Sequence, residues 1–362
     1  MKKWFSVLIM VFMVQTVVWT GAAFAKHSKT GKDSVKTTDV AIKQGKKSHD
    51  SSAAKQSATK SLAASKSSKK KHKSKRTENA EPVAKIQPEP ARPARDPFPT
   101  QVFLRAKAAL LMDMNTGEIL YSLNPDESIA PASLTKLLTL YLIREALQQN
   151  KISPNELIPV SQQASHTGGS RMSLRTGEMT PLDELIKGIS IVSANDACEA
   201  VAEYFGQGDP QAFIDRMNDK AKLLGMTHST FKTPNGLPAP GQYTTARDIL
   251  MLSTDYLHRF PEALAIHSLP NYTHNNRTHT NSNTLLGKFP GVDGLKTGFV
   301  CESGYNIVAT AKRGDTRLLA VVLGSPSKGV RERETEKLLD HGFAMVADNS
   351  DNHRTQLAYH KD

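Results

Sequence analysis

Alternating apolar and polar positions predict two β-hairpins, one near each end of the folded part of the chain. Residues 106–112 and 118–122 flank an Asn-Thr-Gly turn, and residues 304–312 and 317–324 flank a Gly-Asp turn. Strands at both ends, with helices between them, predict one antiparallel sheet built from the two chain ends.

Helical patterns fill the region between the hairpins. Residues 134–147 are apolar nearly all round, which is typical of a helix buried on every side. Helical patterns continue to about residue 260, and residues 331–346 predict a closing amphipathic helix. We therefore expect an α+β domain over residues 101–348, with a sheet flanked by helices, an inserted helical subdomain and a short tail at 349–362.

The first 25 residues have the pattern of a secretory signal peptide. Lys2 and Lys3 give a positive start, residues 4–19 are mostly apolar, and Ala-Phe-Ala at 23–25 matches a cleavage site. An uncleaved anchor is the alternative, although the apolar run is shorter than the roughly 20 residues of a spanning helix. In either case we expect export.

Positive charge is concentrated in residues 26–98. The chain has a net charge of +12, which taken alone is typical of a nucleic-acid-binding protein. Residues 26–98, however, carry 19 Lys and Arg against 7 Asp and Glu, whereas residues 99–362 carry 26 against 28. The folded part is close to neutral, so we expect no nucleic-acid partner.

Residues 26–100 predict a disordered basic segment followed by a Pro-rich linker. They hold almost no large apolar side chains, so burial cannot offset their chain entropy. The Pro-rich stretch at 82–99 should be extended and fairly stiff. Two roles stay open, a solvated spacer or adhesion to anionic envelope polymers or a membrane surface.

A Ser-x-x-Lys sequence at the head of the apolar helix is the first candidate for chemistry. Ser133 and Lys136 are three positions apart, so on a helix their side chains share a face. Pro131 is typical of a helix start, which would put Ser133 in the first turn, where the helix dipole favours negative charge. For Lys136 to act as a base its pKa must fall, and burial near a second cation, for which Lys296 is the candidate, would lower it.

Context and order give this motif its weight, because Ser-x-x-Lys alone is common. Other copies begin, for example, at Ser52, Ser57, Ser229 and Ser325. Ser133 alone heads the apolar helix and is followed in order by two further motifs. These are Ser193-Ala194-Asn195, which ends an apolar stretch, and Lys296-Thr297-Gly298, which opens a predicted strand.

The ordered triple resembles the motifs of the low-molecular-weight penicillin-binding proteins of the D-alanyl-D-alanine carboxypeptidase family. The resemblance runs from about residue 104 to 346 and includes the segments 130–136, 233–237, 245–248 and 293–298. It implies a DD-peptidase/β-lactamase-like fold. It also implies an exported enzyme of the periplasm or cell envelope that removes the terminal D-alanine from peptidoglycan stem peptides, with no metal or organic cofactor.

The same resemblance assigns catalytic roles. Ser133 would attack the carbonyl between the two D-alanines, and Lys136 would take its proton. Ser193 would relay a proton to the leaving amine, and Asn195 would bind the substrate backbone.

Substrate contacts are implied for the third motif. Lys296 and Thr297 would hold the terminal carboxylate, and Gly298 would leave room for a peptide along the strand. The backbone N–H groups of Ser133 and Phe299 would form the oxyanion hole.

Two departures from β-lactamases bear on the reaction with β-lactams. Ala194 stands where those enzymes typically carry Asp, and no Glu-x-x-Leu-Asn segment follows Ser133. We therefore expect β-lactams to inhibit the protein covalently. A DD-endopeptidase with the same residues, a β-lactamase and a non-catalytic wall-binding scaffold remain rival hypotheses. We see no counterpart of the C-terminal β-domain and membrane anchor of some relatives, and the basic segment would substitute for the anchor.

Cysteine and histidine positions add little. Strand parity would put Cys301 on the face of Thr297, towards the cleft, so a disulfide with Cys198 and two buried thiols are both open. His274 and His279 lack an accompanying ligand pattern, so no zinc site is expected.

Overall fold

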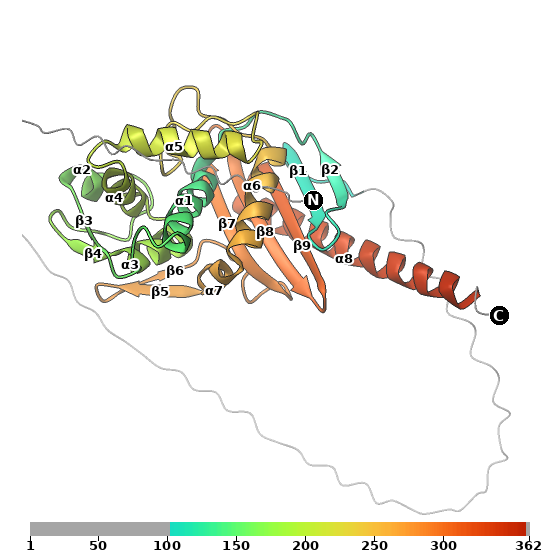
Figure 1. The fold of residues 1–362 in the computed structure, drawn as a ribbon. Helices are drawn as coiled ribbons and strands as arrows, with labels where there is room; N and C mark the ends of the chain where they lie inside the picture. The colour runs from blue at the N-terminus through green and yellow to red at the C-terminus, as the bar shows by residue number, and fades with distance from the viewer. Residues whose placement is uncertain (1–101, 360–362) are drawn as a thin grey trace, which may run out of the picture. The chain divides into compact units, whose positions relative to one another are not determined.

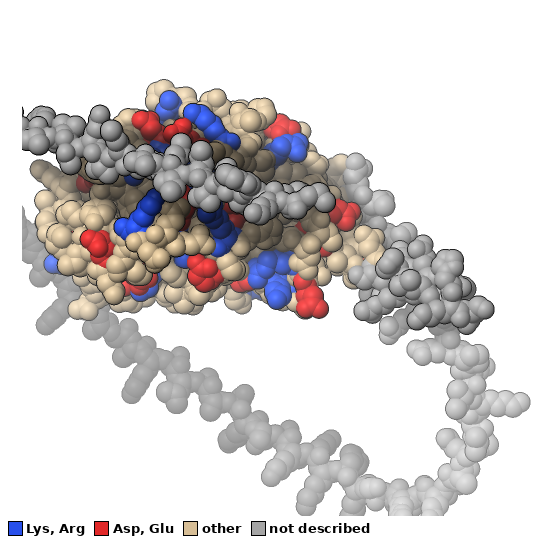
Figure 2. Space-filling model, in the orientation of Figure 1, with Lys and Arg blue, Asp and Glu red and all other residues tan. Residues whose placement is uncertain are grey.

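A computed structural model describes residues 102–359, with side chains through Asn349 (Figure 1). The signal peptide, the basic segment and the Pro-rich linker predicted from the sequence lie outside the described residues. On the visible face of the domain, basic and acidic side chains are interspersed (Figure 2), as the near-neutral charge of residues 99–362 leads one to expect.

The centre of the fold is a five-stranded antiparallel sheet with strand order β2-β1-β9-β8-β7. Its strands are β1 (Ala108–Asp113), β2 (Ile119–Leu123), β7 (Val292–Val300), β8 (Gly304–Arg313) and β9 (Thr316–Ser325). Both predicted hairpins form, and β9 pairs with β1, so the two chain ends share one sheet as expected. Lys296-Thr297-Gly298 was expected to open a strand. It instead lies within β7, because pairing with β8 already begins at Val292.

Alternation along the strands gives the sheet two apolar faces. In β9, Leu319 and Val321 contribute to the core shared with the helical subdomain, whereas Leu318 and Ala320 contribute to a second core. That second core is covered by α8 (Lys328–Tyr359) (Figure 1). Successive side chains point to opposite faces of a strand, so a sheet buried on both faces reads as a nearly continuous apolar run.

The inserted subdomain is mainly helical, as predicted. Its longer helices are α1 (Lys136–Gln148), α4 (Asn195–Phe205), α5 (Pro210–Leu223) and α6 (Ala246–Arg259). The shorter helices are α2 (Gln162–His166), α3 (Leu182–Lys187) and α7 (Leu264–His267), with 3-10 turns at η1 (Ala132–Thr135) and η3 (Pro261–Ala263) and a π-helix at η2 (Gly188–Val192). The predicted α+β class is thus confirmed. Within residues 102–359 no helix is long and apolar enough to cross a membrane.

Two small hairpins in this region were not predicted. They are formed by β3 (Leu157–Pro159) with β4 (Met179–Pro181), and by β5 (Asn271–His274) with β6 (Arg277–Thr280). Strands of three or four residues are too short to show alternation in a sequence.

The last helix is longer than predicted. It begins at Lys328 and continues to Tyr359, so the boundary expected at residue 348 falls inside α8. The sequence prediction stopped at Val346, after which apolar positions no longer recur, but backbone hydrogen bonds propagate a helix without an apolar face.

Candidate active site

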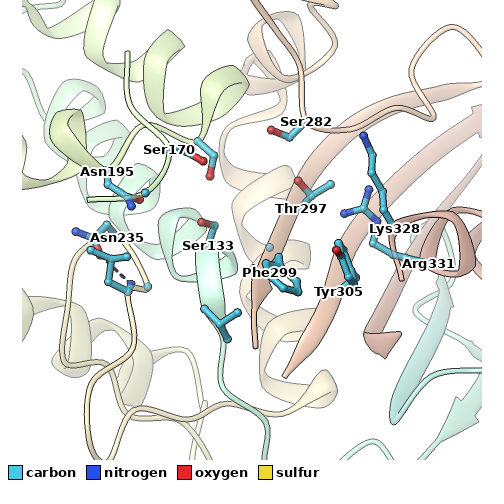
Figure 3. Close-up of a pocket in the computed structure, with 16 residues that line it drawn as sticks. Ser133, Ser170, Asn195, Asn235, Ser282, Thr297, Phe299, Tyr305, Lys328 and Arg331 are labelled. Atoms are coloured by element: carbon cyan, nitrogen blue, oxygen red, sulfur yellow. Dashed lines mark hydrogen bonds between the residues drawn. The ribbon is translucent and has the colours of Figure 1, made fainter. Parts of the chain in front are cut away.

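An open pocket lies where the helical subdomain meets the edge strand β7. Its volume of about 400 Å³ is within the range of roughly 300–1,000 Å³ typical of small-molecule sites. Ser133 lies between Asn195 and Asn235 on one side and Thr297 and Phe299 on the other (Figure 3). Residues from all three sequence motifs therefore line one pocket.

Ser133 and Lys136 are brought together as the spacing predicted. The Lys136 ammonium donates a hydrogen bond of 2.9 Å to Ser133 Oγ. Ser133 lies in the 3-10 turn η1 rather than in the first turn of the α-helix, which begins at Lys136. The predicted contact survives because residues three apart also share a face in a 3-10 helix.

The Lys136 ammonium is fixed from a second side by a loop. It donates a bond of 2.5 Å to the Asn235 carbonyl, and the Thr139 hydroxyl of α1 donates one of 2.6 Å to the Pro234 carbonyl. Lys136 is fully buried, and this burial lowers its pKa to about 8, against opposing contributions from Cys198 and Asp196. Burial, which the sequence analysis expected together with a neighbouring cation, is the main cause of the lowered pKa.

Gly236 lets this loop lie against the turn that carries Ser133. It has a φ of +82°, and a Cβ there would be 1.8 Å from the Ala132 carbonyl oxygen. We predict that Gly236→Ala lowers the free energy of unfolding by about 1–3 kcal/mol more than Gly177→Ala, because of overpacking. Gly177 is a matched control, since its φ is +80° and a Cβ there meets nothing within 4 Å. Equal losses in urea unfolding would contradict this packing.

Ser193 and Lys296 form a second hydroxyl–amine pair. The Lys296 ammonium donates a bond of 2.9 Å to Ser193 Oγ and one of 3.0 Å to the Thr297 carbonyl. Burial, and then repulsion from Lys136, lower the pKa of Lys296 well below its ordinary range.

The position of Lys296 differs from the expectation that it meets a substrate carboxylate directly. It is 2% exposed and does not line the pocket, whereas Thr297 does. Its ammonium instead contacts the hydroxyl of Ser193, which does line the pocket.

Asn195 connects the second motif to the segment opposite β7. Its Nδ2 donates a bond of 2.7 Å to the Gly168 carbonyl, and its backbone N–H donates one of 2.7 Å to the Ser170 carbonyl. Asn195 Oδ1 has no hydrogen-bond partner among the described residues. The side chain of Asn195 is thus held at the pocket by its amide nitrogen, and its oxygen is buried.

The third motif forms the opposite wall of the pocket. A Cβ at Gly298 would lie 3.1 Å from the backbone nitrogen of Ser133, so β7 approaches the η1 turn closely. Thr297 is buried, and Phe299, which is 50% exposed, packs against Tyr305 with 4.4 Å between ring centroids.

Two cations of the pocket were not recognised in the sequence. Lys328 and Arg331, from the first turn of α8, line it beyond Thr297 (Figure 3). Arg331 is 4% exposed, and its Nε has no hydrogen-bond partner within the described part of the chain. The amphipathic pattern predicted the helix, but nothing in it indicated that its first residues reach the pocket.

The segment at 245–248 has a structural role instead. The Thr245 side chain accepts a bond from the Asp248 N–H at the start of α6, and Asp248 Oδ2 accepts bonds from His228 N–H and the Ser229 hydroxyl. Arg247 pairs with Asp126 through two bonds of 2.6 and 2.8 Å.

The cysteines are not joined. Cys198 is buried in α4, Cys301 is exposed, and both are free thiols. The parity argument does not apply to Cys301, because β7 ends at Val300. A disulfide is therefore not formed in this structure.

The two histidines lie on the β5–β6 hairpin. The ring nitrogens of His274 lie 3.3 Å from Glu178 and 3.6 Å from Glu184. Among residues 102–349, no group of three or more His, Cys, Asp or Glu side chains is arranged to hold a metal ion.

Comparison with known families supplies the deciding observation. Residues 96–327 match the family model described as D-alanyl-D-alanine carboxypeptidase. The chain belongs to this family. The D-alanyl-D-alanine carboxypeptidase DacC of Escherichia coli is 43% identical over 245 residues, and DacF of Bacillus subtilis is 38% identical over 244 residues. These matches cover 66% of this chain and 61% and 62% of the relatives, so the chain spans about three fifths of their length.

Solved structures of the family share the fold. The carboxypeptidase DacD of Francisella tularensis is similar with a TM-score of 0.66 and 33% identity, covering 70% of this chain and 74% of that one. Penicillin-binding protein D2 of Listeria monocytogenes, in a cefotaxime-bound form, is similar with a TM-score of 0.62 and 34% identity. That match covers 67% of this chain and 99% of the other. The expected DD-peptidase-like fold is thus confirmed.

Proposed function

We propose that this family member is a serine D-alanyl-D-alanine carboxypeptidase that removes the terminal D-alanine from peptidoglycan stem peptides. The observation that carries the proposal is the 2.9 Å hydrogen bond between Lys136 Nζ and Ser133 Oγ on the floor of an open pocket. The similar proteins named above carry this activity in their names.

Acylation would begin with attack of Ser133 Oγ on the carbonyl carbon between the two D-alanines. Neutral Lys136 takes the hydroxyl proton, which its lowered pKa of about 8 favours. The backbone N–H groups of Ser133 and Phe299 stabilise the oxyanion, since both residues line the pocket. The C–N bond then breaks, and the proton that Lys136 took reaches the leaving amine through the Ser193 hydroxyl, which is in contact with Lys296. Lys136 is then neutral again and Ser193 keeps a proton.

Deacylation would use the same groups in reverse order. Water attacks the acyl carbon and loses a proton to Lys136. The bond between the acyl carbon and Ser133 Oγ then breaks, and Lys136 returns that proton to Ser133 Oγ. Throughout, the side-chain amide of Asn195, a residue that lines the pocket, holds the substrate backbone by a hydrogen bond. A β-lactam would form the same ester with Ser133, and we expect that ester to persist because the chain has no Glu-x-x-Leu-Asn segment after Ser133.

The terminal carboxylate would lie between the Thr297 hydroxyl and the Arg331 guanidinium. Both groups line the pocket, and a guanidinium pairs well with a carboxylate. Lys296 adds positive charge from behind the strand and orients Ser193, so we assign it an indirect part in carboxylate binding.

Arg331→Gln should lower kcat/KM about 10- to 100-fold for peptides with a free terminal carboxylate, since one charge-assisted contact is lost. Peptides with an amidated C-terminus should be affected much less. Arg333→Gln, an exposed residue two positions along the same helix, serves as the control. An equal loss on both substrates would argue against this contact.

Digestion of purified muropeptides tests the proposed activity against its nearest rival. Release of free D-alanine from pentapeptides supports the carboxypeptidase, and conversion of cross-linked dimers to monomers supports the endopeptidase. Rapid turnover of nitrocefin would indicate a β-lactamase instead.

We also propose export to the cell envelope, on the basis of residues 1–25, and contact of the basic segment with anionic polymers or lipids. Deleting residues 26–98 should leave the rate of peptide hydrolysis unchanged. If the protein were instead a non-catalytic scaffold that depends on the basic segment, the deletion would abolish its function. The full-length protein would then release no D-alanine either.

A further inference from the structure

Asp196, directly after Asn195, holds a carboxylate that the reaction above does not use. It is 0% exposed and lies in the first turn of α4, where a helix favours negative charge. A buried carboxylate needs several donors to replace its water. The groups that donate hydrogen bonds to the Asp196 carboxylate therefore indicate its role.

Those donors come mainly from one irregular segment. Asp196 Oδ1 accepts the N–H groups of Met172 at 3.1 Å and Ala197 at 3.0 Å. Oδ2 accepts those of Ser173 at 2.9 Å and Leu174 at 3.1 Å. Three successive amides of the 172–174 segment, which belongs to no helix or strand, are thus bound by one side chain.

The same segment reaches the pocket a few residues earlier. Gly169 and Ser170 line it opposite β7, and the Gly168 and Ser170 carbonyls accept bonds from Asn195. Ser173 has a φ of +70°, a conformation that a residue other than glycine keeps only when its surroundings impose it. The first turn of α4 therefore fastens this wall at two adjacent residues.

We propose that Asp196 is a positioning residue that fixes the 168–174 segment, and through it Asn195 and Ser170, at the distance from Ser133 that substrate binding requires. The substrate named in this proposal rests on the proposed function, whereas the hydrogen bonds between Asp196 and the 172–174 segment do not depend on it. Because misplacement of binding groups by about 1 Å costs on the order of 100-fold in rate, the effect on acylation should be large.

The charge of Asp196 also affects the pKa of Lys136, which can be measured separately from any loss of structure. Its carboxylate raises the pKa of Lys136, as does Cys198 in its ionised form, against the dominant effect of burial. Burial raises the pKa of Cys198 to about 12, so near pH 8 that thiol is neutral. The other charged and titratable groups nearby are Glu199, Lys296 and His279. Neutralising Asp196 should therefore lower the pKa of Lys136.

Two variants of the full-length chain separate geometry from charge. For both Asp196→Asn and Asp196→Glu we expect kcat/KM for a D-alanyl-D-alanine peptide to fall on the order of 100-fold. Only in Asp196→Asn should the acid limb of the pH profile of acylation also move to lower pH. Asp219→Asn, an exposed aspartate on α5, is the matched control and should match the wild type. Wild-type rates in both variants, or an unmoved acid limb in Asp196→Asn, would overturn the proposal.

Hydrogen exchange on the wild-type protein tests the fastening even if a variant does not fold. The amides of Met172, Ser173 and Leu174 should exchange slowly, although they lie outside regular structure. The Arg171 amide, which donates no hydrogen bond within the described residues, should exchange quickly. Fast exchange at all four amides would refute the fastening but would not bear on the proposed activity. Slow exchange at Met172, Ser173 and Leu174, in a protein that releases no D-alanine, would support the fastening and refute the activity.

Discussion

Ser133→Ala should reduce release of D-alanine from a stem pentapeptide by at least about 10⁴-fold, because no other hydroxyl can take over the covalent step. Ser193 is the nearest alternative nucleophile in the site, but its hydroxyl contacts Lys296, whereas Lys136 contacts Ser133. The change removes one partly exposed oxygen and should leave the unfolding midpoint nearly unchanged. Free D-alanine is measured over time, with a thermal melt recorded for each variant.

Ser325→Ala is the matched control for this loss. Ser325 begins another Ser-x-x-Lys copy and is fully buried, and its Oγ has no hydrogen-bond partner among the residues described. This variant should keep wild-type activity. If Ser325→Ala were inactive and Ser133→Ala active, the choice of nucleophile from motif order and context would be wrong.

Lys136→Met should slow acylation by about 10²–10⁴-fold, the usual contribution of a general base. Methionine has a similar length and no basic nitrogen, so the fully buried site stays filled while the contacts with Ser133 and the Asn235 carbonyl are lost. Stopped-flow measurement of acylation by a chromogenic β-lactam isolates this step. Lys222→Met, at an exposed lysine of α5, is the control.

The pH dependence of the wild type gives the same base a second signature. The reactive form of Lys136 is neutral, so the acylation rate should rise with pH and level off above about 8, where its pKa lies. Lys136→Met should lose this rise together with most of the rate. A wild-type rate that does not change between pH 6 and 9 would contradict general-base catalysis by Lys136.

Local patterns predicted most of the fold because its main elements carry their own signals. The turns of the two hairpins and the apolar run after Ser133 each mark one element, and α1 is buried at nearly every position from Lys136 to Ile143. The β3–β4 and β5–β6 hairpins have no such signal. The last helix was predicted too short because a repeating apolar pattern marks only the part of a helix that packs against the core. Helix α8 continues beyond that part.

Sequence spacing predicted those contacts of the candidate site that are made between residues of the same helix or strand. Ser133 and Lys136 share a helical face at any location, so their contact follows from the sequence. Lys296 was predicted to hold the substrate carboxylate, and its contact with the Ser193 hydroxyl did not follow from any spacing in the sequence. Arg331 and Asp196 were missed, because their importance depends on which distant segments the fold brings against them.

Covalent labelling tests the central claim most directly, namely that a serine activated by a neighbouring buried lysine forms an ester with the substrate. The full-length protein is incubated with benzylpenicillin, its intact mass is measured, and the modified peptide is sequenced by mass spectrometry. We predict the addition of one penicilloyl group, carried by Ser133. An unmodified protein, or an adduct on any other residue, would contradict the account.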